Sequence, residues 1–197
     1  MLPLGPSPRT CGARHTRPMP TDPGSETTRL FFAIVPDDVA RSRLDALARE
    51  AARAAGGRAT LASTLHLTVV FVGNVRAAAV ADVRAAGDAI AWPGFDIALD
   101  VLGSFARAGV AWAAPAHVPR DLAEVNRALV RALADRGFET DPRPYRPHLT
   151  LARRCTRVVE GTIDPPIAWR VDRIVLMSSR LLPGGPRYRE VAGWATG

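Results

Sequence analysis

The tripeptide His-Leu-Thr occurs twice in this chain, at residues 66–68 and 148–150, and each copy opens a short apolar run. The other two histidines, His15 and His117, lack the pattern. Side chains alternate along a β-strand, so the histidine and the threonine of each copy share one face and the leucine lies on the other. Each copy also follows a segment with helical spacing. We therefore predict two similar lobes that face one another, each with a strand that begins at His-Leu-Thr.

Apolar periodicity and turn residues predict the remaining elements. Asp37 is the expected N-cap of the first helix and Gly56 its stop. Several neighbouring strands are joined by short turns, so we expect a mostly antiparallel sheet and an α+β fold class. The predicted strands are 29–36, 65–73, 95–106, 109–116, 148–154, 170–182 and 187–195, and the predicted helices are 37–56, 75–91 and 119–137.

The two tripeptides carry the residue types that phosphodiester chemistry needs. In the first strand, His66 and Thr68 share one face, and Leu67, Val69 and Phe71 are expected to be buried on the other. Imidazole gives or takes a proton near neutral pH, and a threonine hydroxyl can donate to a phosphate oxygen. Two such pairs on facing strands supply an acid, a base and two phosphate anchors. In-line attack of water on a phosphodiester requires these groups.

The second tripeptide lies in a basic segment, residues 143–157, which contains five arginines and no acidic residue. Such a segment is often only a solvated loop, but its position beside His148 favours contact with an anionic substrate. Tyr145 lies within it and could stack on a base. The candidate RNA-binding residues are Arg143, Tyr145, Arg146 and Arg154.

Composition excludes several other classes of enzyme. The net charge is +7 and favours an anionic partner, yet all 26 basic residues are arginine. Without lysine, the chain can form neither an adenylated-lysine ligase site nor a P-loop. The sequence contains no HExxH motif and no close cluster of His, Cys and carboxylate residues, so we expect no metal and no other cofactor. Serine hydrolysis lacks its G-x-S-x-G turn.

Residues 1–27 contain six prolines and three glycines without periodicity, and we predict that they form a disordered N-terminal extension. The alternative is a misassigned start, with Met19 as the candidate first residue. The segment has no apolar stretch typical of a signal peptide, and no run in the chain is long enough to span a membrane. The two cysteines, Cys11 and Cys155, lie far apart and suit a reducing compartment. We expect a cytoplasmic protein without a disulfide or a membrane partner.

The chain resembles the 2H phosphoesterase superfamily, and within it the RNA 2′,3′-cyclic phosphodiesterases, historically called 2′-5′ RNA ligases. The matching stretches are "RLFFAIVP", "LHLTVVFVGNV", "YRPHLTLARR" and "LMSSRLLPGGPRYREVAGW". The resemblance implies that residues 28–197 form one domain of two similar lobes, related by pseudo-twofold symmetry around a central cleft. It also implies metal-free opening of a 2′,3′-cyclic phosphate to a 2′-phosphate.

The same resemblance implies the role of each site residue. His66 is the expected proton donor to the leaving 3′ oxygen, and His148 is the expected proton acceptor that activates water. Thr68, Thr150 and Arg153 are expected to hold the phosphate. In a regular strand, however, Arg154 shares the face of His148 and Arg153 does not. Either a bulge turns Arg153 inward or Arg154 takes its place.

The expected partner is RNA with 2′,3′-cyclic phosphate ends, with tRNA fragments among the candidates, bound by a monomer. Reverse 2′-5′ ligation is chemically open, because an RNA hydroxyl can replace water. Two alternatives remain: a cyclic phosphodiesterase that acts on a small nucleotide, and an RNA-binding protein without catalysis. The domain charge and the arginine-rich segment favour RNA over a small nucleotide, and two intact tripeptides argue against a non-catalytic protein.

Overall fold

The computed structural model describes residues 27–182 and 185–195. Most of the predicted N-terminal extension therefore lies outside the described residues. Thr27 does not belong to that extension, since it opens the first strand and pairs with Arg76. In chain order the elements are β1 (Thr27–Ile34), α1 (Asp38–Ala55), β2 (Arg58–Ala59), η2 (Ala62–Thr64), β3 (Leu67–Arg76), η3 (Ala77–Ala79), α2 (Val80–Asp88), β4 (Phe95–Phe105), η4 (Ala106–Ala108), β5 (Val110–Ala114), α3 (Arg120–Ala134), β6 (Leu149–Arg153), β7 (Gly161–Val171), β8 (Arg173–Leu182) and β9 (Gly185–Ala195).

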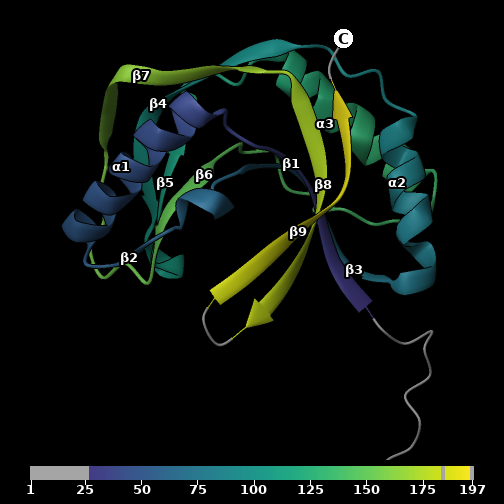
Figure 1. Cartoon of the computed structure of the whole chain (residues 1–197), viewed down its shortest axis with the longest axis horizontal. Coiled ribbons are helices and arrows are strands. Elements are labelled where there is room, and N and C mark those ends of the chain that lie inside the picture. The colour runs from purple at the N-terminus through teal and green to yellow at the C-terminus, as the bar shows by residue number, and fades with distance from the viewer. Residues whose placement is uncertain (1–26, 183–184, 196–197) are drawn as a thin grey trace, which may run out of the picture.

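The strands form one antiparallel sheet in the order β7-β4-β5-β6-β3-β1-β8-β9, with β2 paired to β6. The predicted α+β class with a mostly antiparallel sheet is confirmed. The two halves of the sheet meet at β3 and β6, which pair through Leu67 and Leu149. Figure 1 shows α1 with one half of the sheet and α2 and α3 with the other.

The lobes do not correspond to the two halves of the sequence. Helix α1 comes early in the chain, yet it packs against β6, whereas the later helix α3 packs against β3. The helix in each lobe therefore covers the His-Leu-Thr strand that it does not immediately precede. The chain crosses between the lobes, so each strand that follows a candidate catalytic histidine depends on both halves of the sequence.

Helix α1 begins and ends where its capping residues predict. The Asp37 carboxylate accepts a hydrogen bond from the Ala40 backbone N–H at 2.7 Å, which satisfies one of the free donors of the first turn of α1. Gly56 ends the helix in the left-handed conformation with a φ of 65°. The apolar stripe of α3 is buried in the core, as its spacing predicts. Its buried residues include Leu122, Val125, Leu129 and Leu133.

Several predicted boundaries differ from the structure, and two of the differences are large. The helix expected over residues 75–91 is shorter, because β3 continues to Arg76 and a 3-10 turn precedes α2. Strand β7 was not expected before residue 170, since it contains Pro165 and Pro166. It lies at the edge of the sheet, where a residue without an N–H is tolerated. Within the described residues, no helix is both long and apolar enough to cross a membrane.

Candidate active site

The two His-Leu-Thr tripeptides lie side by side where β3 meets β6. Leu67 and Leu149 are direct cross-strand partners, and both are fully buried. One step along an antiparallel register from this pair, His66 lies across from Thr150, and Thr68 lies across from His148. All four side chains are half-buried on the face opposite to the leucines. Two tripeptides far apart in the sequence thus form one cluster of imidazoles and hydroxyls.

The two imidazoles are held in the same way. Nδ1 of His66 lies 2.8 Å from the Thr64 carbonyl oxygen, and Nδ1 of His148 lies 2.9 Å from the Arg146 carbonyl oxygen. A carbonyl oxygen can only accept, so Nδ1 carries a proton in both rings and donates it. This leaves Nε2 of each ring as the atom that can exchange a proton with a substrate.

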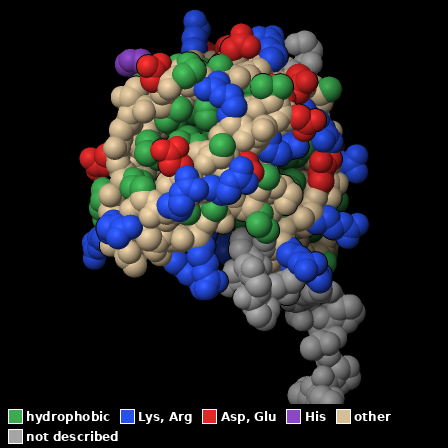
Figure 2. Space-filling view, turned by 60° about the vertical axis from the view of Figure 1, so that its left-hand side comes forward, with side chains coloured by type: hydrophobic (Ala, Val, Ile, Leu, Met, Phe, Trp, Pro, Cys, Tyr) green, Lys and Arg blue, Asp and Glu red, His purple; other side chains and the backbone are tan. Residues whose placement is uncertain are grey.

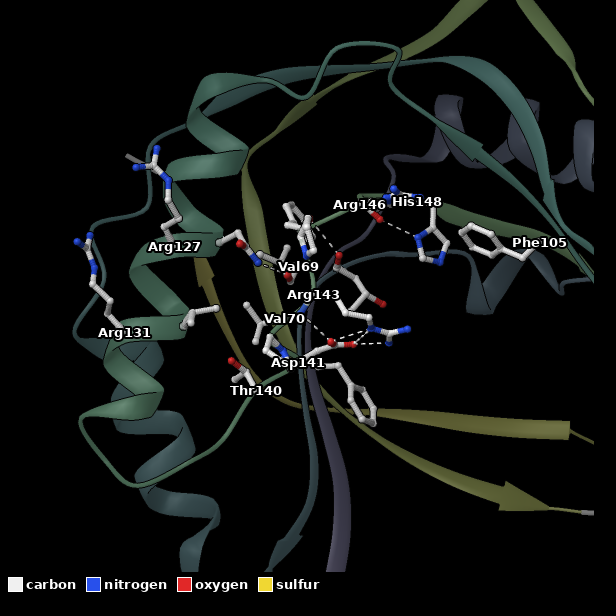
Figure 3. A pocket seen from close by; sticks show the side chains of 17 residues that line it. Val69, Val70, Phe105, Arg127, Arg131, Thr140, Asp141, Arg143, Arg146 and His148 are labelled. Carbon is white, nitrogen blue, oxygen red and sulfur yellow. Dashed lines mark hydrogen bonds and ion pairs between the residues drawn. The ribbon is translucent and has the colours of Figure 1, made fainter. Parts of the chain in front are cut away.

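Aromatic rings pack against both histidines. The Phe31 ring lies 4.9 Å from the His66 ring, and the Tyr188 ring meets His66 edge-on at 5.0 Å. On the other side, Phe105 meets the His148 ring edge-on at 5.0 Å, and Figure 3 shows the two rings next to each other. Phe105 packs in turn on Trp112, with ring centroids 5.4 Å apart. The imidazoles therefore have defined orientations before a substrate arrives.

Burial lowers the pKa of the His66 imidazole below its ordinary value. The hydrogen bond to Thr64 opposes this shift, and the positive charges of Arg153 and His148 add to it. Two conclusions follow. Arg153 and His148 lie close enough to His66 to act on its charge, and His66 in the free protein is held toward its neutral form.

A β-bulge brings Arg153 to the face of the histidines. Thr150 pairs with Trp112 and Ala152 pairs with Ala111, so Leu151 is the extra residue in β6. The bulge reverses the alternation after Thr150. Arg153 then pairs with Val110 and shares the face of Trp112 and Thr150. Arg154 is the first residue after β6 and has a φ of 58°. The alternation of side chains along the strand therefore does not put Arg154 on the histidine face.

An equivalent bulge in β3 places Phe71 on the histidine face. Thr68 pairs with Ala33 and Val70 pairs with Phe32, so Val69 is the extra residue. The prediction that Phe71 is buried beside Leu67 is therefore wrong, and the side chain is 41% exposed. The Arg29 guanidinium lies over its ring, 4.9 Å from the centroid. Phe71 follows His66 by five residues, as Arg153 follows His148. Comparing these two positions could have identified Phe71 from the sequence.

A pocket of about 980 Å³ opens beside His148, and we call it the His148 pocket. It lies between β3, α3 and residues 140–146, and Figure 3 shows its lining. Thr68, Phe71 and His148 form part of its wall, so it is continuous with the histidine cluster. Asn126 of α3 donates a hydrogen bond to the carbonyl of the bulge residue Val69 at 2.8 Å. That bond fixes the helix next to the cluster.

The predicted RNA-binding residues occupy different positions around this pocket. Arg143 and Arg146 line it, and Arg143 forms an ion pair with Asp141. Arg154 is absent from the lining. Tyr145 lines the pocket but packs against the core, and its hydroxyl donates to the Thr68 carbonyl oxygen at 3.1 Å. Burial raises the pKa of its phenol. Tyr145 thus supports the backbone at Thr68 through its hydroxyl, while its half-buried ring lines the pocket.

A second pocket of about 500 Å³ lies beside His66, and we call it the His66 pocket. Its lining includes Tyr188 together with three arginines and four carboxylates. Each of the three arginines forms an ion pair with a carboxylate. The pairs are Arg41–Asp38, Arg170–Asp96 and Arg173–Glu190. Among residues 27–182 and 185–195, no three His, Cys, Asp or Glu side chains are grouped closely enough to hold a metal ion.

Comparison with known proteins identifies the family. The sequence model of the 2′-5′ RNA ligase superfamily matches residues 35–181. The chain belongs to the 2′-5′ RNA ligase superfamily. One member, the RNA 2′,3′-cyclic phosphodiesterase of Escherichia coli strain K12, is 33% identical over 175 residues, which cover 87% of this chain and 98% of the relative. The RNA 2′,3′-cyclic phosphodiesterase of Thermotoga maritima is 27% identical over 177 residues, or 82% of this chain and 91% of the relative.

Solved structures of the superfamily have the same fold. The crystal structure of Escherichia coli LigT complexed with 3′-AMP superposes with a TM-score of 0.79 at 30% identity, covering 87% of this chain and 99% of LigT. LigT complexed with phosphate superposes with a TM-score of 0.73 at 29% identity over the same shares of the two chains. The resemblance inferred from the repeated tripeptide is confirmed.

Proposed function

We propose that this protein hydrolyses 2′,3′-cyclic phosphate ends of RNA to 2′-phosphomonoesters. The observation that carries the proposal is the junction at Leu67 and Leu149, which brings two imidazoles and two threonine hydroxyls to one face of the sheet. Each imidazole has its Nδ1 engaged by a backbone carbonyl and its Nε2 left for proton transfer. An acid and a base on either side of one phosphorus atom suit in-line displacement.

The proposed mechanism has one displacement step. His148 takes a proton from water, and the water oxygen attacks phosphorus as the bond to the 3′ oxygen breaks. His66 gives a proton to that oxygen. Thr68 and Thr150 donate hydrogen bonds to the non-bridging oxygens, and Arg153 offsets the charge that develops on them. These groups supply proton transfer and charge stabilisation themselves, so the step needs no metal. A 5′-hydroxyl of RNA in place of water gives the reverse 2′-5′ ligation.

The bound phosphodiester brings His66 into the protonation state that an acid needs. In the free protein, burial and the charges of Arg153 and His148 lower its pKa. The negative charge of the cyclic phosphate favours the protonated imidazole and raises the pKa again. His66 is therefore recruited as the proton donor when substrate is present.

Two observations support RNA as the substrate. Relatives named RNA 2′,3′-cyclic phosphodiesterase match most of this chain. The His148 pocket also carries four arginines and a single carboxylate beside the histidine cluster, as suits a polyanion. One chain supplies both histidines and both threonines, so we propose a monomer. RNA fragments with cyclic ends, tRNA fragments among them, are its proposed substrates.

Hydrolysis of a short RNA with a 2′,3′-cyclic phosphate end, in the presence of a strong chelator, tests the proposal. The same RNA with a 3′-monophosphate end is the matched control. We expect the cyclic end to open and the control to remain unchanged. Loss of hydrolysis on chelation, restored by one added metal ion, would show that the mechanism is wrong. The absence of any opening would overturn the activity itself.

A further inference from the structure

The arginines around the two pockets differ in their partners. Arginine side chains are spread over the surface, with acidic side chains among them (Figure 2), so an arginine alone does not mark a site. The three arginines of the His66 pocket are each paired with a carboxylate. In the His148 pocket, Arg143 alone forms such a pair within the described residues, with Asp141. Positive charge without a carboxylate partner is therefore concentrated on the His148 side.

Two of these arginines lie one turn apart on α3. Arg127 and Arg131 both line the His148 pocket and are exposed. Within the described part of the chain, neither has a carboxylate at ion-pair distance, and Arg127 donates only to the Ala123 carbonyl at 3.2 Å. Figure 3 shows both guanidinium groups on the same outer side of α3, across the pocket from His148. Arg127 and Arg131 together form what we call the basic rim, at the edge of the His148 pocket that is far from His148.

The helix that carries this rim has a fixed position relative to the phosphate site. Asn126, next to Arg127 in sequence, holds α3 to Val69, which follows Thr68. Side chains four residues apart on a helix lie about 6 Å apart along its axis. Arg127 and Arg131 can therefore each meet a separate phosphate of one extended strand.

We propose that the RNA strand on the 5′ side of the cyclic phosphate crosses the His148 pocket, and that Arg127 and Arg131 bind two of its backbone phosphates. The proposal rests on the proposed function, since it extends from the cyclic phosphate at the histidines. The His66 pocket does not serve as the path, because its arginines are neutralised. The rim contributes affinity for longer RNA and takes no part in the chemical step.

A length series tests this path. The substrates are a nucleoside 2′,3′-cyclic monophosphate and a hexanucleotide with the same cyclic end. The test variant is Arg127→Ala/Arg131→Ala. Its matched control is Arg49→Ala/Arg53→Ala on α1, which removes the same charge at the same spacing. Neither of those arginines lines either pocket, so the control should leave the path of the RNA intact. Alanine favours helix, so both variants should fold.

We expect the wild type and the control to have a kcat/KM for the hexanucleotide roughly 10-fold or more above that for the mononucleotide at low salt, and the test variant to lose most of this gain. Hydrolysis of the mononucleotide should be equal in all three proteins. The same gain in the test variant, or no gain in the wild type, would overturn the path. If no protein hydrolyses either substrate, the proposed function fails, and binding of the hexanucleotide still tests the rim.

The salt dependence of binding gives a second readout. Each phosphate contact to a single strand contributes about 0.7 to the slope of log affinity against log salt. Loss of two contacts should therefore reduce the slope for the hexanucleotide by about 1.4 in the test variant. An unchanged slope, or an equal decrease in the α1 control, contradicts specific contacts at Arg127 and Arg131.

Discussion

At the residue scale, His66 and His148 have matching environments. Each ring donates from Nδ1 to a carbonyl two residues earlier and packs against a phenylalanine. We predict that His66→Ala and His148→Ala each lower kcat by at least ~100-fold, the low end for loss of a general acid or base. The double variant should be little slower than either single variant, because in the proposed mechanism the two groups act in one step. Near-normal turnover by either folded single variant contradicts the mechanism.

Substitution of Arg153, the last residue of β6, and of its neighbour Arg154 tests which of the two arginines acts on the phosphate. The bulge at Leu151 places Arg153 on the histidine face, and Arg154 follows the strand with a left-handed backbone. We predict that Arg153→Ala lowers kcat by roughly 10- to 100-fold, because in the proposed mechanism it removes charge stabilisation of the transition state. Arg154→Ala should change kcat by less than about threefold. If the two effects are reversed, Arg154 is the residue that acts on the phosphate.

The buried imidazole of His66 also links stability to pH. Its pKa in the folded protein is lowered from 6.5, so the unfolded chain binds more protons in this range. The free energy of unfolding should therefore be highest above pH 6.5 and decrease as the pH falls toward the lowered pKa. We predict that His66→Gln flattens this dependence between about pH 7.5 and 5.5, as measured by urea unfolding. An equally steep dependence in the variant would show that another group is responsible.

At the element scale, the β4–β5 hairpin orients His148 through a stack of aromatic rings. Gly103 lies under Trp112, and a Cβ there would come within 2.3 Å of the indole ring. Trp112 packs on Phe105, which meets the His148 ring edge-on. We predict that Gly103→Ala displaces this stack and lowers kcat by roughly 10-fold or more, since small misplacements of catalytic groups are costly.

The control for this prediction is Gly87→Ala in α2. A Cβ at Gly87 would come within 2.4 Å of Trp194, so the overpacking is comparable, but Trp194 packs on Phe32 and Trp92. Both variants should lose stability, by about 1–3 kcal/mol for overpacking. Only Gly103→Ala should lose turnover per folded molecule. Equal activity in the two variants argues that the hairpin does not orient His148.

Elements with a clear local pattern could be predicted from the sequence. The cap at Asp37, the stripe of α3 and the two His-Leu-Thr strands follow from neighbouring residues alone. The bulges in β3 and β6 could not, because each depends on the register that a partner strand imposes. Alternation alone therefore assigns Phe71 to the wrong face of β3, and it cannot decide whether Arg153 or Arg154 lies on the histidine face. Strand β7 was missed for a similar reason, since its prolines are tolerated only because it lies at an edge.

At the scale of the whole molecule, the site depends on long-range connections. Helix α1 covers β6 and α3 covers β3, so each lobe combines early and late parts of the chain. The matched environments of the two histidines are arranged about the Leu67–Leu149 pair, at the centre of the sheet. A twofold relation of the complete lobes remains a prediction from the sequence. The junction explains why two short and locally weak motifs make one site.

Analysis of the product end tests the central claim most directly. If His66 protonates the 3′ oxygen and His148 activates water, the opened RNA ends in a 2′-phosphate and a free 3′-hydroxyl. Treatment of the hydrolysed RNA with a 3′-specific phosphatase should then release no phosphate, whereas a non-specific phosphatase should release it fully. Release by the 3′-specific enzyme would show that the ring is held the other way round and that the assigned roles of His66 and His148 are wrong.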